Sequence, residues 1–186
     1  MNPAIRLWSR HAANCFLALL AAAALVTGCG PSGPFKAALE KAKTGDLQAQ
    51  MEVGQMYLEG RDVKQDSTEG LSWIKQAAQK GFPPAERSYG MILRVAPPPA
   101  GNAEQGRQWL EKAARHGDTL AQIELAGIHG LFSPPFDFVE AMKWVLVAEK
   151  GGSTNTPSIK KMLEAQMSAS DVAKARARAD EFVVEK

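Results

Sequence analysis

The sequence predicts an all-α protein, a short α-solenoid of stacked antiparallel helix pairs, from three observations. First, one segment, residues 49–81, is followed by two near-copies of itself at a step of 36 residues, which shortens to 35 late in the third copy. Second, each copy carries two helical stripes of apolar residues. Third, the composition is 45% hydrophobic but only 7% aromatic, as expected for an alanine-rich helical protein. The positions that mark the period are Ala49, Ala85 and Ala121, Trp73, Trp109 and Trp144, and Gly81, Gly117 and Gly152.

Each copy reads as two short helices, because its apolar residues recur three and four positions apart. In the first copy the two stripes are Ala49, Val53, Met56 and Tyr57, then Gly70, Trp73, Ile74 and Ala77. Small residues recur where helix backbones are expected to approach closely, and the tryptophans recur where a large gap must be filled. We therefore expect all three indole rings in the core. The glycine that closes each copy is expected to adopt the left-handed conformation that ends a helix.

Three sets of segments carry a resemblance to a known repeat family. They are the Gly-x-x-x-Ala junctions that begin at Gly45, Gly81 and Gly117, the segment VGQMYLEG, and the segments WIKQAAQKG, WLEKAARHG and WVLVAEKGG. Together they resemble the SEL-one-like repeat, a relative of the tetratricopeptide repeat. The resemblance implies repeats at about residues 45–81, 82–117 and 118–152, which bind proteins through their stacked helices. The third copy departs from the pattern, with His129 at the tyrosine position and Glu149 at the second alanine.

Residues 1–28 have the pattern of a secretory signal peptide, because Arg6 and Arg10 precede an apolar run that is too short to span a bilayer. The run ends in LVTGC, which resembles the bacterial lipobox. The resemblance implies a diacylglycerol and an N-acyl chain on Cys29, a tether at residues 29–34, and a solenoid at 35–186. Because Gly30 rather than an aspartate follows the cysteine, it also implies an outer-membrane location that faces the periplasm. The alternative is an ordinary secretory signal with an incidental cysteine near its end.

Charge and cysteine content change when the signal is removed. The chain has 22 Lys and Arg against 20 Asp and Glu, and the surplus of two is Arg6 and Arg10 of the signal. The mature chain is therefore neutral, and we expect no nucleic-acid partner. Cys15 would leave with the signal and Cys29 would carry lipid, so the folded part is expected to have no disulfide.

Further helices are expected at both ends of the repeat array. Residues 35–43 place their apolar side chains on one face, and we expect this helix to cap the first pair rather than to form a frayed tail. Beyond the third copy, residues 158–184 are expected to form two capping helices, at 158–167 and 170–184. The spacing of Ser168 and Asp171 resembles a capping box at the start of the second of these helices.

The loops within the repeats carry capping residues, prolines and aromatic residues. In the first loop, Asp66 or Ser67 is expected to cap the next helix. The prolines at 97–99 fit either a polyproline ligand or a stiffened loop, and we favour the stiffened loop there and at 134–135, because a helix must end in both places. The phenylalanines of the third loop either form an exposed patch or close the end of the stack, and we favour closure. They are Phe132, Phe136 and Phe138.

The chain carries no recognisable set of residues for catalysis or metal binding. His116 is expected to lie in the last turn of a helix, where a positive charge interacts favourably with the helix dipole. His129 is expected to have a packing or surface role. In the mature chain, no Cys or His residues stand at zinc-ligand spacing, and no glycine-rich phosphate loop is present. Glu40, Glu111 and Glu149 are expected to be solvated charges on polar helix faces. We therefore expect neither enzymatic activity nor a cofactor apart from the lipid.

In the related tetratricopeptide architecture, the first helix of each pair lines a concave groove. Transferring this geometry by register predicts a partner-binding groove at Gln55, Glu59, Arg87, Met91 and Arg94. Two of these, Arg87 and Arg94, lie seven residues apart and would suit a carboxylate-bearing peptide. The sequence thus predicts a periplasmic, lipid-anchored scaffold for an unidentified protein partner. The alternatives are a peptidoglycan-remodelling enzyme or accessory factor, and a pilot lipoprotein for a secretion or pilus assembly.

Overall fold

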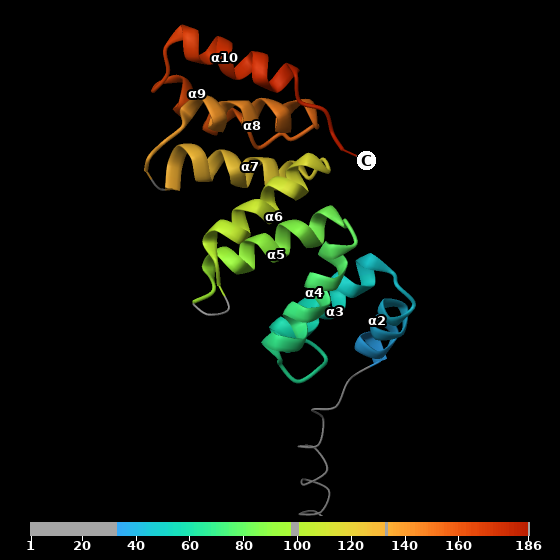
Figure 1. Ribbon diagram of the computed structural model, residues 1–186. Coiled ribbons are helices and arrows are strands. Elements are labelled where there is room, and N and C mark those ends of the chain that lie inside the picture. Colours follow the sequence, from blue (N-terminus) through green and yellow to red (C-terminus); the bar gives the residue numbers. More distant parts are fainter. Residues whose placement is uncertain (1–32, 98–100, 133, 186) are drawn as a thin grey trace, which may run out of the picture.

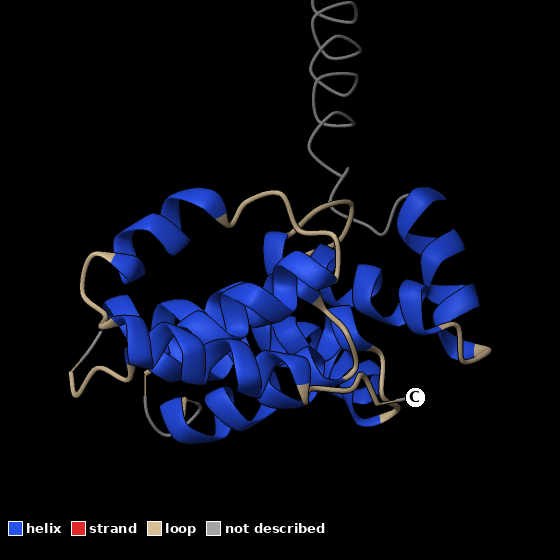
Figure 2. Ribbon diagram, turned by 90° about the horizontal axis from the view of Figure 1, so that it is seen from above, coloured by secondary structure: helices blue, strands red, loops and turns tan. Residues whose placement is uncertain are grey.

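The structure of the protein is a computed structural model that describes residues 33–97, 101–132 and 134–185 (Figure 1). Within these residues every regular element is helical, and Figure 2 shows only helices and connecting loops. The predicted signal at 1–28, Cys29 and most of the tether lie outside the described residues. The elements in chain order are α2 (Gly33–Lys43), α3 (Leu47–Glu59), α4 (Ser67–Gln79), α5 (Pro83–Val95), α6 (Ala103–Arg115), α7 (Thr119–Gly127), a π-helical turn (Ile128–Phe132), α8 (Phe138–Lys150), α9 (Pro157–Glu164) and α10 (Ala169–Asp180).

Consecutive helices pack against one another from α2 to α9, and α10 packs on α8, so the chain forms one continuous stack (Figure 1). The pairs α3–α4, α5–α6 and α7–α8 are the three copies of the repeat. The stack confirms the predicted solenoid, and α2 packs on α3 as the predicted cap.

The hydrophobic core lies mainly between successive repeats. One cluster joins α2 to α3, a second joins α4 to α5, and a third extends from α6 through α8 to α10. Each cluster therefore joins the second helix of one unit to the first helix of the next. This explains why an isolated pair could not bury its own apolar face.

Within the first two pairs, the helices cross at glycines. A Cβ atom added to Gly54 would lie 2.8 Å from the carbonyl oxygen of Gly70, and one added to Gly70 would lie 2.7 Å from the oxygen of Gly54. Gly90 and Gly106 repeat this contact in the second pair, at 2.7 and 2.6 Å. The backbones touch, so a side chain would have to push the helices apart.

The helix ends follow the predicted signals. The closing glycines Gly81, Gly117 and Gly152 have φ angles of 81°, 86° and 89°, which confirms their left-handed conformation. Asp66 rather than Ser67 caps α4, and its carboxylate accepts hydrogen bonds from the backbone N–H groups of Thr68 and Glu69. The other side-chain N-caps are Asp46, Asn102, Asp118, Asp137 and Ser168.

The prediction that all three tryptophans lie in the core is correct only for Trp144, which is 5% exposed. Trp73 and Trp109 are half-buried, and Trp73 Nε1 donates to Glu69 Oε1 at 3.0 Å near the surface. The fully buried position is the next one along the helix, where the side chains are Ile74, Leu110 and Val145. The half-buried position lets the indole N–H of Trp73 reach Glu69, whereas Trp144 Nε1 is buried with no hydrogen-bond partner among the described residues.

The third copy differs most from the prediction. The phenylalanines were expected to close the stack, but Phe132 is 61% and Phe136 is 46% exposed. The chain leaves α7 through the π-helical turn, which carries Phe132 outwards, whereas Phe138 begins α8 and packs against the core. The last helix was also predicted too long, because α10 ends at Asp180 and the residues after it are not helical.

Candidate functional site

The five residues of the predicted groove lie on two helices, α3 and α5. Gln55 and Glu59 belong to α3, where Glu59 pairs with Arg61 at 3.1 Å. The other three lie on α5. Arg87 Nε is 3.1 and 3.2 Å from the two carboxylate oxygens of Asp118, the N-cap of α7.

Arg87 therefore links the second repeat to the third. Met91 also packs against the third hydrophobic cluster, whereas the Arg94 stem covers Gly106 of α6 within the same repeat. The structure thus brings Arg87 and Met91 together on the side of α5 that faces the third repeat.

An open groove of about 610 Å³ lies between the first and second repeats. It is formed by α4 and the end of α5, and none of the five predicted residues lines it. Val95, which directly precedes a lining residue, is 78% exposed. The lining residues are Leu58, Ser67, Thr68, Leu71, Ser72, Lys75, Tyr89, Ile92 and Ala96.

The walls of this groove are mainly apolar, with hydroxyl groups and one charge at the rim. Leu71 and Ile92 pack against the cluster below, while Thr68 and Ser72 are exposed. Lys75 is the only charged side chain among the described residues of the lining. An apolar surface with a few polar groups and one ammonium suits a segment that carries apolar side chains and a carboxylate.

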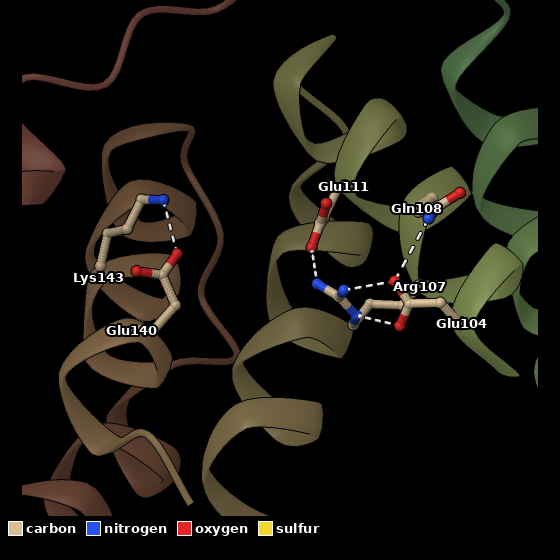
Figure 3. A network of polar contacts seen from close by, with 6 residues as sticks. All are labelled: Glu104, Arg107, Gln108, Glu111, Glu140 and Lys143. Carbon is tan, nitrogen blue, oxygen red and sulfur yellow. Dashed lines mark hydrogen bonds and ion pairs between the residues drawn. The ribbon is translucent and has the colours of Figure 1, made fainter.

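A second surface, formed by the outer sides of α6 and α8, is charged (Figure 3). Arg107 lies between Glu104 and Glu111 and bonds both, and the Arg107 hydrogen bond lowers the pKa of Glu104. On α8, Lys143 pairs with Glu140 at 2.7 Å. Positive and negative groups pair with one another here, so the surface presents no uniform positive field that would attract a nucleic acid.

The first helix of each repeat also carries a buried polar residue that was not among the predicted site residues. Gln50 and Gln122 each donate Nε2 to a backbone carbonyl of the preceding helix, those of Ala42 and Ala114, at 3.0 Å. These bonds tie the first repeat to the capping helix α2 and the third repeat to the second. The position can be recognised in the sequence, because Gln50, Glu86 and Gln122 are 36 residues apart. Each directly follows one of the alanines that mark the repeat period.

In the second repeat this position holds Glu86, a fully buried carboxylate. A carboxylate cannot donate to a carbonyl, so it turns instead to α6. Glu86 Oε2 is 2.7 Å from His116 Nδ1, and Lys112 Nζ lies 2.9 Å from Oε1, outside hydrogen-bond geometry. His116 therefore pairs with a buried acid rather than only complementing the end of α6.

Two of the three glutamates expected to be solvated are instead held in place. Glu111 is half-buried beside Arg107. Burial alone would raise the pKa of Glu149, but hydrogen bonds from Lys160 at 2.8 Å and Thr156 at 2.9 Å outweigh it and hold the pKa below its usual value. Glu149 thereby fastens α9 to α8.

No described residues form a cluster of three or more His, Cys, Asp or Glu side chains suited to a metal ion. In the same parts of the chain, no helix is long and apolar enough to cross a membrane.

Comparisons with known proteins concern the repeats and the fold. A family model described as the Sel1 repeat matches residues 47–82, 95–118 and 119–153. The chain is similar in structure to a protective antigen of uropathogenic Escherichia coli strains that displays an SLR fold, with a TM-score of 0.67 and 23% identity over 80% of this chain and 32% of that one. It is also similar to a Sel1 repeat protein from Oxalobacter formigenes, with a TM-score of 0.64 and 22% identity over 78% of this chain and 62% of that one. The chain thus spans less than two thirds of either protein, and no curated protein matches it.

Proposed function

Because the chain belongs to the Sel1 repeat family, we propose that it is a non-catalytic scaffold that binds another protein. We further propose that a lipid on Cys29 anchors it in the outer membrane, facing the periplasm. Sel1 repeat proteins generally mediate protein–protein interaction, and the family is typically non-catalytic. The pattern of residues 1–29, a signal followed by a lipobox-like LVTGC, supports the anchor.

The single observation that carries the binding proposal is the apolar groove between α4 and α5. Its volume of about 610 Å³ is sufficient for a few side chains of a partner segment. Lys75 at the groove wall would pair with a carboxylate of that segment. The groove lies between two repeats whose helices are fixed by packing, so a partner would meet a preformed surface.

Filling the groove is expected to prevent partner binding without unfolding the protein. Ser72 is exposed at the rim, and Ser72→Trp would place an indole over the apolar walls. We expect co-purification of the partner from detergent-solubilised membranes to fall at least about tenfold, which corresponds to about 1.4 kcal/mol of binding free energy. The matched control is Ser170→Trp, at an exposed serine of α10 far along the stack. Equal recovery with both variants would place the partner elsewhere.

Lipid attachment is tested by replacing the acceptor thiol. Cys29→Ser removes the only sulfur at the expected processing site, so the variant should lose the lipid mass and partition into the aqueous phase of a detergent extraction. Cys15→Ser alters the other cysteine, within the expected signal, and should behave as the wild type. If Cys29→Ser has the same mass and membrane partition as the wild type, the protein is not a lipoprotein.

A further inference from the structure

The last described residues, 181–185, form a non-helical tail that returns to the body of the stack. Figure 1 shows it leaving α10 and running back past α8. Lys150 Nζ lies 2.6 Å from Asp180 Oδ1 and donates to the Ala179 carbonyl at 2.8 Å, which fastens the end of α10 to α8. The tail therefore begins at a point that Lys150 fixes to α8.

The first contact between the tail and the helical stack is made by the aromatic side chain of Phe182. The ring of Phe182 meets that of Trp144 edge to face, with the centroids 5.5 Å apart. Lys143 Nζ lies 4.0 Å from the Trp144 ring centroid and 6.0 Å from that of Phe182. Phe182 is half-buried at this point and acts as an anchor in the groove between α6 and α8.

Three residues further on, the tail pairs with the end of α6. The Glu185 N–H group donates to the Arg115 carbonyl oxygen at 2.9 Å, and Arg115 is the last residue of α6, where helix carbonyls lack internal partners. Arg115 Nε also lies 3.3 Å from Glu185 Oε1. Val184 covers Gly117 so closely that a Cβ atom there would be 3.2 Å from Val184 Cγ1.

An aromatic anchor, a backbone hydrogen bond and a paired carboxylate are the means by which proteins recognise extended peptides. The fit is incomplete, however. A hollow of about 310 Å³ remains beside Phe182, lined by Glu111, Arg115, Glu140, Lys143 and Trp144. The Arg115–Glu185 pair is weak, because its side chains are 44% and 55% exposed. Such a weak ligand stays bound because its tether keeps it at millimolar effective concentration.

We propose that the groove between α6 and α8 is a second protein-binding site, which the tail at 181–185 occupies as a built-in competitor. The partner segment is an extended one that carries an aromatic residue and, three positions later, a carboxylate. This site is separate from the groove between α4 and α5, so its failure would leave the function proposed above untouched.

The proposal is tested with a labelled peptide of sequence EFVVE and the full-length protein. In the wild type the tail is docked and should compete with the peptide. In the full-length variant Phe182→Ala/Glu185→Gln, the groove is open, so peptide affinity measured by fluorescence anisotropy should be at least about tenfold tighter. The control peptide EAVVQ should not bind either protein. Glu185→Gln alone alters only a half-exposed contact, so this variant should fold even if the double variant does not. Its affinity for EFVVE should be higher than that of the wild type and lower than that expected for the double variant.

Several outcomes would overturn the proposal. Equal binding of EFVVE to the wild type and to Glu185→Gln would mean that the tail is no competitor. Equal binding of EFVVE and EAVVQ to the open variant would remove the assigned specificity. A wild-type dimer that the double variant loses would show that tails are exchanged between copies, which would replace the partner segment with a second copy of this chain.

Discussion

Trp144→Ala is expected to lower the free energy of unfolding by about 3–5 kcal/mol, as large-to-small changes of buried aromatic residues do. Trp144 is 5% exposed and lies in the cluster that joins α6, α8 and α10. Its removal would leave a cavity and would also deprive Phe182 of its contact. Chemical denaturation followed by circular dichroism measures the loss.

Trp73→Ala is the matched control, at the same position of the first repeat. Its ring is half-buried, so we expect a loss of only about 1–2 kcal/mol. Similar losses for the two variants would contradict the burial difference between the first and third repeats.

The second large effect concerns the helix crossing in the second repeat. Gly90→Ala would place a methyl group 2.7 Å from the Gly106 carbonyl oxygen and 3.1 Å from the Leu110 backbone nitrogen, and neither backbone atom can move alone. Alanine favours helix over glycine by about 1 kcal/mol, yet we expect a net destabilisation of about 2–3 kcal/mol because α5 and α6 must separate.

Gly33→Ala controls for the addition of a methyl group without a steric clash, because an added Cβ at this first residue of α2 meets nothing within 4 Å. It should leave stability within about 0.5 kcal/mol of the wild type. A thermal melt of Gly90→Ala that matches the wild type would mean that the two helices do not touch at this point.

The fold could be predicted from the sequence because the residues that define the repeat are found in few other structural settings. A glycine with a positive φ angle, such as Gly81, and a small residue at a helix crossing, such as Gly54, are strongly constrained by backbone geometry. Their spacing therefore indicated both the helix ends and the pairing. The depth of burial was harder to predict, because a shift of one residue around a helix separates the buried Leu110 from the half-buried Trp109.

The surfaces were less predictable still, because they depend on contacts between residues far apart in sequence. Arg87 pairs with Asp118 and Glu86 with His116, and each partner lies about thirty residues away. The periodic pattern fixes the helices but not the choice of partner. For the same reason, neither groove could be predicted, since Lys75 approaches Ile92 only when the first and second repeats stack.

Site-specific photo-crosslinking from position 72 tests the scaffold function most directly. A benzophenone amino acid would replace Ser72 in the full-length protein, in cells that make it, and Ser170 would be replaced in the control. The proposal predicts one defined, light-dependent adduct from position 72, identifiable by mass spectrometry, and its absence from position 170. No adduct from position 72, or the same adducts from both positions, would contradict the proposal that the groove between α4 and α5 binds a partner.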